Sequence, residues 1–149
     1  MGVITLPSQG VIYIDTQTII YTVQRHPVYA SVCRPLWQAA KAGQLSIISS
    51  DLTLMEALVM PVRNADTALV DQFRNFLLRS DIFLQPITQE ILESAASLRA
   101  QIPGLKTPDA LHAATALLHK CALFVTNDKG FRRIPGLSLA ILDDILASA

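Results

Sequence analysis

The segment VIYID (residues 11–15) is an apolar run that stops at an acidic residue, and LFVTND (residues 123–128) repeats this pattern. Short apolar runs rich in β-branched and aromatic residues predict β-strands. Asp15 and Asp128 would then each follow the carboxyl end of a strand. In an open α/β sheet this edge is where ligands bind, because strand ends and helix starts converge there. The two acids therefore mark a candidate site.

Outward from these segments, strand-like and helical patterns alternate along the chain. Strands are expected at 11–15, 45–49, 82–85, 123–126 and 139–142. Helices are expected at 18–25, 28–42, from residue 51 to just before Pro61, and at 66–79, 88–102 and 107–120. Strands separated by helices imply an α/β fold with a parallel sheet. We find no repeat, low-complexity segment or linker, so residues 1–149 are expected to form one domain.

Composition narrows the class of protein. Half of the chain is apolar (51%), but no apolar run has the roughly 18 residues that a membrane span requires. Residues 1–10 lack the features of a signal peptide, so a cytoplasmic protein with no membrane partner is expected. Twelve basic residues balance twelve acidic ones, so any nucleic-acid binding must be local. Cys33 and Cys121 lie in helical patterns without metal-ligand spacing and are expected to be buried, reduced thiols.

Two further acids, Glu56 and Asp109, lie in the opening turns of expected helices. Carboxylates that gather at one sheet edge raise each other's pKa unless a cation neutralises them, which favours a bound divalent ion. Mg²⁺ takes oxygen ligands and is usually held by one or two carboxylates, water and substrate phosphate. Such an ion activates a water and neutralises phosphate charge, and a second metal could join it. Thr126 could orient a carboxylate or a metal-bound water.

Each acid also has a purely structural interpretation. Asp109 follows an expected N-cap and first helical residue at 107–108, where an acid favours the helix dipole. The pair at 127–128 could form an ordinary turn, and Glu56 could be a solvated helix residue. Asp15 is the strongest candidate, because a strand end offers no helical reason for an acid. The joint occurrence of all four in this order favours a metal site.

These segments together resemble the PIN domain. The resemblance rests on Asp15-Thr16 after the first strand, on Glu56 early in the helix after the second, and on TPDALHAATA (residues 107–116) and TNDKGF (residues 126–131). It covers nearly the whole chain, and the order and spacing are most similar to bacterial VapC-type toxins.

The resemblance implies a three-layer α/β/α sandwich with a central, mostly parallel sheet. It also implies cleavage of RNA phosphodiester bonds, a neutralising antitoxin and a homodimer. The implied catalytic residues, which would bind Mg²⁺ or Mn²⁺, are Asp15, Glu56, Asp109 and Asp128. Their neighbours Thr16, Thr126 and Asn127 would support them.

Two positions depart from the family pattern. Gln17 replaces the small Ser or Asn that is common two residues into the first motif, which could alter a supporting hydrogen bond. Gly130 stands where many relatives carry another Asp before the Phe, which leaves Asp128 as the only acid of its segment.

Three basic residues, Lys129, Arg132 and Arg133, follow Asp128. They are either ordinary solvated charges or, at the rim of an acidic pocket, contacts for RNA phosphates.

A few other residues are candidates for the site or for an interface. His112 lies one turn beyond Asp109 and could approach the site, but a packed helical histidine is the expected interpretation. Trp37, Phe73 and Phe76 are expected in the core, with a subunit interface as the alternative.

The expected function is a Mg²⁺- or Mn²⁺-dependent endoribonuclease, the toxin of a toxin–antitoxin pair. A phosphatase of the aspartyl-phosphate type would need Asp-x-Asp at the first strand, and Gln17 argues against it. A receiver-like signalling domain would need a Lys at the end of the late strand, where the chain has TND (residues 126–128). The alternative of another class is a non-catalytic PIN-like scaffold that binds RNA or protein. Retention of all four acids argues against that scaffold, and a metal titration would decide.

Overall fold

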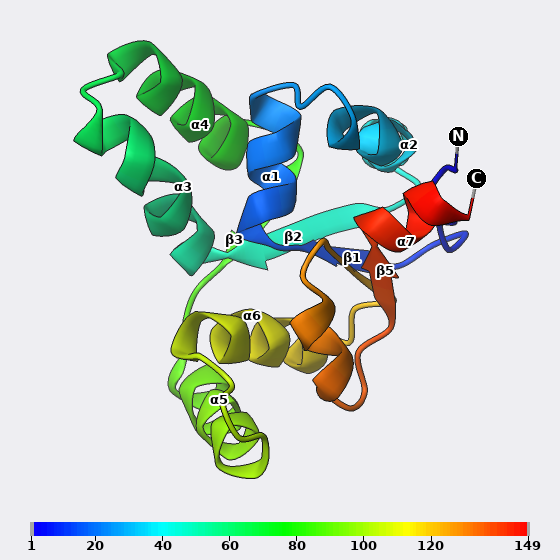
Figure 1. Ribbon diagram of the computed structural model, residues 1–149, viewed down its shortest axis with the longest axis vertical. Coiled ribbons are helices and arrows are strands. Elements are labelled where there is room, and N and C mark those ends of the chain that lie inside the picture. Colours follow the sequence, from blue (N-terminus) through cyan, green and yellow to red (C-terminus); the bar gives the residue numbers. More distant parts are fainter. Residues whose placement is uncertain (1, 149) are drawn as a thin grey trace.

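The computed structural model describes residues 2–148, and its strands form one sheet with the order β3-β2-β1-β4-β5 (Figure 1). Every pairing in the sheet is parallel. The strands are β1 (Val11–Ile14), β2 (Ser46–Ser50), β3 (Ile82–Gln85), β4 (Leu123–Thr126) and β5 (Leu139–Ile141). The expected parallel α/β sheet is confirmed.

Helices cover both faces of the sheet (Figure 1). One face carries α1 (Thr16–Val23), α2 (Tyr29–Lys41) and α7 (Leu142–Ala147), and beside α1 stands a hairpin of α3 (Asp51–Arg63) and α4 (Thr67–Arg79). The other face carries α5 (Gln89–Gln101), α6 (Thr107–Leu118) and the short 3₁₀ helix η1 (Lys129–Arg133). The three-layer α/β/α sandwich is therefore confirmed.

The two layers bury separate apolar cores because successive strand residues point to opposite faces. In β1, Ile12 and Ile14 join the core under α1, α2 and α4, whereas Tyr13 joins the core under α5 and α6. Phe73 is buried, as expected for a core residue. Trp37 and Phe76 are only partly buried and meet edge to face, with ring centroids 5.1 Å apart.

Several boundaries differ from the sequence expectation. Helix α1 begins at Thr16 rather than at residue 18, directly after the first strand. Helix α3 continues through Pro61, which is buried, and its last turn is closed by the Asn64 amide, which donates to the Met60 carbonyl. The short elements η1 and α7 were not expected. Both have fewer residues than two helical turns, so the sequence carries too little periodicity to reveal them.

Two smaller expectations concern the cysteines and the membrane. Both cysteines are free thiols; Cys33 is buried and Cys121 is partly buried. Burial raises the pKa of each thiol to about 12. Among residues 2–148, no helix combines the length and apolar character that crossing a membrane would require.

Candidate functional site

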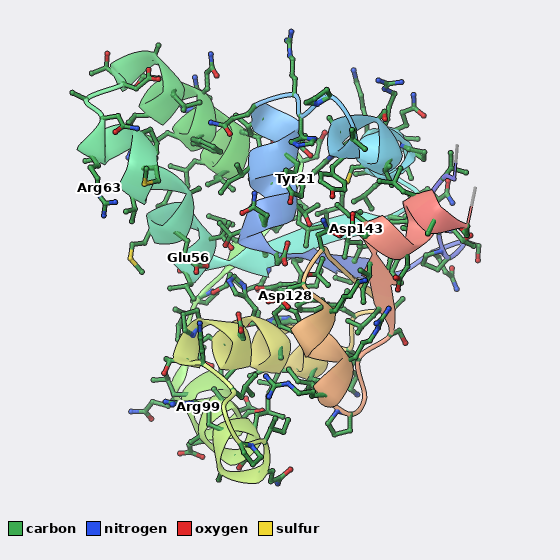
Figure 2. The ribbon with its side chains drawn as sticks, viewed as in Figure 1. Tyr21, Glu56, Arg63, Arg99, Asp128 and Asp143 are labelled. Atoms are coloured by element: carbon green, nitrogen blue, oxygen red, sulfur yellow. The ribbon has the colours of Figure 1, made fainter. Side chains whose placement is uncertain are left out.

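A pocket of about 390 Å³ lies where the carboxyl ends of β1 and β4 meet the first turns of α1, α3 and α6. Its lining includes all four acids expected from the sequence: Asp15, Glu56, Asp109 and Asp128. Glu56 on α3 and Asp128 after β4 are labelled in Figure 2, which places them on opposite sides of this region. The fold thus brings together residues that are far apart in the sequence.

Asp15 is held rigidly at the bottom of this pocket. Its Oδ1 accepts hydrogen bonds from the Thr18 amide (3.1 Å) and the Thr18 hydroxyl (2.7 Å), and its Oδ2 accepts one from Thr126 Oγ1 (2.5 Å). Burial raises the pKa of Asp15, and the hydrogen bonds from Thr126 and Thr18 oppose that rise without cancelling it. A buried carboxylate with no cationic partner in contact is suited to receive a metal ion.

Asp15 also has a structural role that the sequence interpretation missed. It is the N-cap residue of α1, because this helix starts immediately after β1. The expectation that a strand end gives no helical reason for an acid was wrong, since the carboxylate satisfies a free amide of the first turn. Asp15 therefore both caps α1 and lines the pocket.

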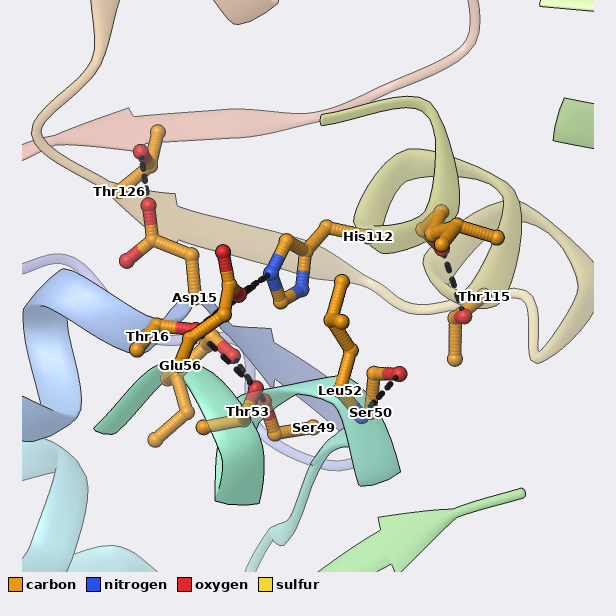
Figure 3. A network of polar contacts seen from close by, with 12 residues as sticks. Asp15, Thr16, Ser49, Ser50, Leu52, Thr53, Glu56, His112, Thr115 and Thr126 are labelled. Atoms are coloured by element: carbon orange, nitrogen blue, oxygen red, sulfur yellow. Dashed lines mark hydrogen bonds and ion pairs between the residues drawn. The ribbon is translucent and has the colours of Figure 1, made fainter. Parts of the chain in front are cut away.

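Thr126 connects two of the acids. Its hydroxyl donates to Asp15 (Figure 3). The same hydroxyl accepts a hydrogen bond from the Asp128 amide at 3.0 Å. Asn127 lines the pocket, and its side-chain oxygen accepts from the Asp143 amide at 2.9 Å, which ties the turn after β4 to α7. Of these two residues, only Thr126 contacts a carboxylate of the pocket.

Asp128 is exposed and caps η1, with its Oδ1 accepting from the Gly130 amide at 2.8 Å. A Cβ at position 130 would lie only 3.0 Å from the same oxygen. A side chain at this position would require the Asp128 carboxylate to shift by a few tenths of an ångström, so Gly130 permits its present placement.

Glu56 is held by two donors on one oxygen. Its Oε1 accepts from Thr16 Oγ1 and lies against His112 Nε2, each at 2.7 Å (Figure 3). Burial raises the pKa of Glu56, but the hydrogen bonds from His112 and Thr16 outweigh burial and leave it below its ordinary value. Glu56 therefore stays ionised, as a metal ligand must.

His112 lines the pocket, although the sequence interpretation preferred a packed helical histidine over one that approaches the site. It is buried, as expected for a packed histidine, but it also lines the pocket and contacts Glu56. Its spacing from Asp109, three residues along one helix, was the available signal, because such residues share a helix face.

Asp109 lies in the first turn of α6, whose N-cap is Lys106, so that Thr107 is already helical rather than the expected cap. Burial raises the pKa of Asp109, and the negative charge of Asp128 raises it further. No hydrogen bond within residues 2–148 reaches its carboxylate. The Asp109 carboxylate is therefore favoured by the helix dipole and disfavoured by burial and by the charge of Asp128.

The donor set fits Mg²⁺ or Mn²⁺, because it consists of carboxylate oxygens, several of which receive no hydrogen bond. Within residues 2–148, no three His, Cys, Asp or Glu side chains are already arranged to hold an ion.

The expected RNA-contacting residues have different surroundings. Lys129 is exposed beside Asp128. Arg132 forms an ion pair with Asp144, and Arg133 donates to the Pro103 carbonyl at 2.9 Å. Of the three, only Lys129 makes no side-chain hydrogen bond or ion pair within residues 2–148.

Comparison with known proteins gives a family and several similar structures. A sequence profile of the PIN domain matches residues 12–137. The chain is similar to VapBC2 from Rickettsia felis bound to a DNA fragment from their promoter, with 20% identity, TM-score 0.67, and 88% of this chain and 98% of that chain covered. It is also similar to a toxin–antitoxin complex from Klebsiella pneumoniae, with 29% identity, TM-score 0.60, and 85% and 94% covered. No curated protein matches the chain.

Proposed function

Because the chain belongs to the PIN-domain family, we propose that it is a Mg²⁺- or Mn²⁺-dependent endoribonuclease and the toxin of a VapBC-type toxin–antitoxin pair. The observation that carries this proposal is the pocket in which Asp15, Glu56, Asp109 and Asp128 converge from four segments of the chain. A non-catalytic scaffold would not require four carboxylates to converge in one pocket. The likeness to toxin–antitoxin complexes supports the toxin assignment.

In this proposal the four carboxylates hold the metal, and the neighbouring hydroxyls hold the carboxylates. A bound Mg²⁺ or Mn²⁺ would supply an activated water and neutralise charge on the scissile phosphate. Thr126 fixes Asp15 through a hydrogen bond of 2.5 Å, and Thr16 fixes Glu56 at 2.7 Å. Among the described residues no Ser or Cys lines the pocket, which fits attack by water rather than by a side chain.

The partners follow from the charge of the site. In this proposal Lys129, which is exposed next to Asp128, contacts an RNA phosphate at the pocket rim. Without metal, the clustered acids are an uncompensated negative site. An antitoxin segment that presents Arg or Lys to these acids would neutralise the site through charge-assisted hydrogen bonds. A homodimer remains part of the proposal.

The test compares two aspartates that play the same structural role. Asp15 and Asp66 both cap helices, each accepting from a backbone amide at 3.1 Å, but only Asp15 lines the pocket. Asn caps helices about as well as Asp, so both Asp→Asn variants should fold. We expect Asp15→Asn to abolish cleavage of single-stranded RNA and the growth defect on expression, and Asp66→Asn to change neither.

Metal dependence is tested in the same assay. Cleavage should require Mg²⁺ or Mn²⁺ and should stop with EDTA. RNA that binds but is never cut with either ion would favour the scaffold. Cleavage that persists in EDTA would refute the metal mechanism.

A further inference from the structure

A chain of buried polar groups runs from β1 through α6 to the pocket. Tyr13 on β1 is fully buried, and its hydroxyl lies 2.5 Å from Nδ1 of His112 on α6. His112 is 3% exposed, and its other ring nitrogen, Nε2, lies 2.7 Å from Glu56 Oε1 on α3. These contacts join three separate elements and end on a carboxylate of the proposed metal site.

The chemistry of Tyr13 and Glu56 determines where the protons lie in this series of hydrogen bonds. A tyrosine hydroxyl, with an ordinary pKa of about 10, carries its proton at neutral pH and can donate. If the hydroxyl donates to Nδ1, a neutral imidazole carries its hydrogen on Nε2 and donates it to the Glu56 carboxylate. Tyr13 thus selects the tautomer that can hold Glu56.

The two donors that reach Glu56 share a single oxygen. Thr16 and His112 both donate to Oε1, and no hydrogen bond within residues 2–148 reaches Oε2. With Oε1 fixed from two directions, the carboxylate cannot rotate freely, and Oε2 is left for another ligand. Glu56 lines the pocket, so that ligand comes from the pocket.

We propose that His112 is a positioning residue that fixes the Glu56 carboxylate for metal binding, and that Tyr13 sets its tautomer. This rests on the proposed metal-dependent function, and it assigns roles to two residues outside the carboxylate set. Partners of this kind commonly contribute a factor of about 10 to 100 in metal affinity when they hold a ligand in place. A histidine that merely packs in the core would contribute nothing to metal affinity.

The first experiment measures Mn²⁺ affinity of the full chain by calorimetry in three variants. His112→Leu should weaken Mn²⁺ binding by about 10- to 100-fold. His112→Gln, whose side-chain amide nitrogen can replace Nε2 as a donor, should recover most of that loss. Tyr13→Phe keeps the ring but frees the tautomer, so a smaller loss of the same sign is expected.

The matched control is Tyr29→Phe. Tyr29 also donates to a carboxylate, Asp143 Oδ1 at 2.6 Å, but does not line the pocket, so its loss should leave Mn²⁺ affinity unchanged. A second readout needs no metal: ¹⁵N chemical shifts of His112 at pH 8 should show hydrogen on Nε2 in the wild type and a mixture of tautomers in Tyr13→Phe.

The outcomes separate this inference from the proposed function. Wild-type affinity in His112→Leu, or failure of His112→Gln to recover a loss, would overturn the positioning role while leaving the nuclease proposal intact. An Nδ1-protonated His112 in the wild type would overturn the role of Tyr13. A wild-type protein that neither binds Mn²⁺ nor cuts RNA would refute the proposed function and the positioning role with it.

Discussion

Replacing Thr126 with Val removes one hydroxyl and almost no volume. That hydroxyl donates to Asp15 Oδ2 at 2.5 Å and accepts from the Asp128 amide at 3.0 Å. Thr126 is 0% exposed and Asp15 only 6%, so water cannot easily take the place of the lost donor. The change therefore leaves a buried carboxylate with one hydrogen bond fewer.

The expected loss of stability is set by the charge of the acceptor. A hydrogen bond to a charged group contributes about 1.5 to 3 kcal/mol, and the bond from the Asp128 amide adds about 0.5 to 1.5 kcal/mol. We expect Thr126→Val to lower the free energy of unfolding by about 2 to 4.5 kcal/mol. For a chain of this size, a 3 kcal/mol loss lowers the melting temperature by roughly 6 to 12 °C.

The loss should depend on pH in a definite direction. Burial already raises the folded-state pKa of Asp15 despite the bonds from Thr126 and Thr18, and removing Thr126 raises it further. When the folded pKa is raised, ionisation favours the unfolded state. The unfolded-state pKa is the same for both proteins, so the deficit of the variant should grow as the pH rises through the raised folded-state pKa of Asp15 and shrink below it.

The measurement is urea denaturation in EDTA between pH 4 and 8, with Thr115→Val as the matched control. Thr115 is also 0% exposed and donates at 2.7 Å, but to the neutral Leu111 carbonyl of its own helix. The control should lose about 0.5 to 1.5 kcal/mol at every pH. Equal deficits in the two variants at pH 8, or a deficit of Thr126→Val that does not change with pH, would refute the reasoning.

Three other outcomes are expected. Asp109→Asn should melt higher than wild type in EDTA at pH 8, because burial and the charge of Asp128 disfavour the Asp109 carboxylate by more than the helix-dipole effect of about 0.3 to 1 kcal/mol favours it. Added Mn²⁺ should reverse the order of the melting temperatures in scanning calorimetry. A variant that melts lower in both conditions would leave Asp109 only its helical role. Both cysteine thiols, with pKa raised to about 12, should react slowly with iodoacetamide at pH 8 in the folded protein and rapidly in urea, and equal rates would contradict their burial. In filter-binding at low salt, Lys129→Gln should weaken RNA binding more than Arg132→Gln, because Arg132 already pairs with Asp144. A larger loss of RNA binding in Arg132→Gln would show that the arginine is the RNA contact.

The sequence by itself determined the parallel α/β architecture and predicted the four acids that line the pocket. Strand and helix periodicity is a local property, and a strand end is a local event, so VIYID and LFVTND predicted both the strands and the edge where their acids gather. The β3 boundaries were predicted to the residue, because its apolar run is bounded on both sides by polar or proline positions. The short helix α7 was not predicted, since its six residues show too little periodicity.

Only the tertiary structure decided what each side chain touches. His112 and Tyr13 are separated by 99 positions, and His112 and Glu56 by 56, so no local pattern could show that they form one hydrogen-bonded chain. Their meeting depends on the register of β1 in the sheet and on how α3 and α6 pack against it. The same is true of Thr126 and Asp15, 111 positions apart. Sequence patterns reveal periodicity within a segment, whereas the partners of a buried polar group are fixed by the packing of distant segments.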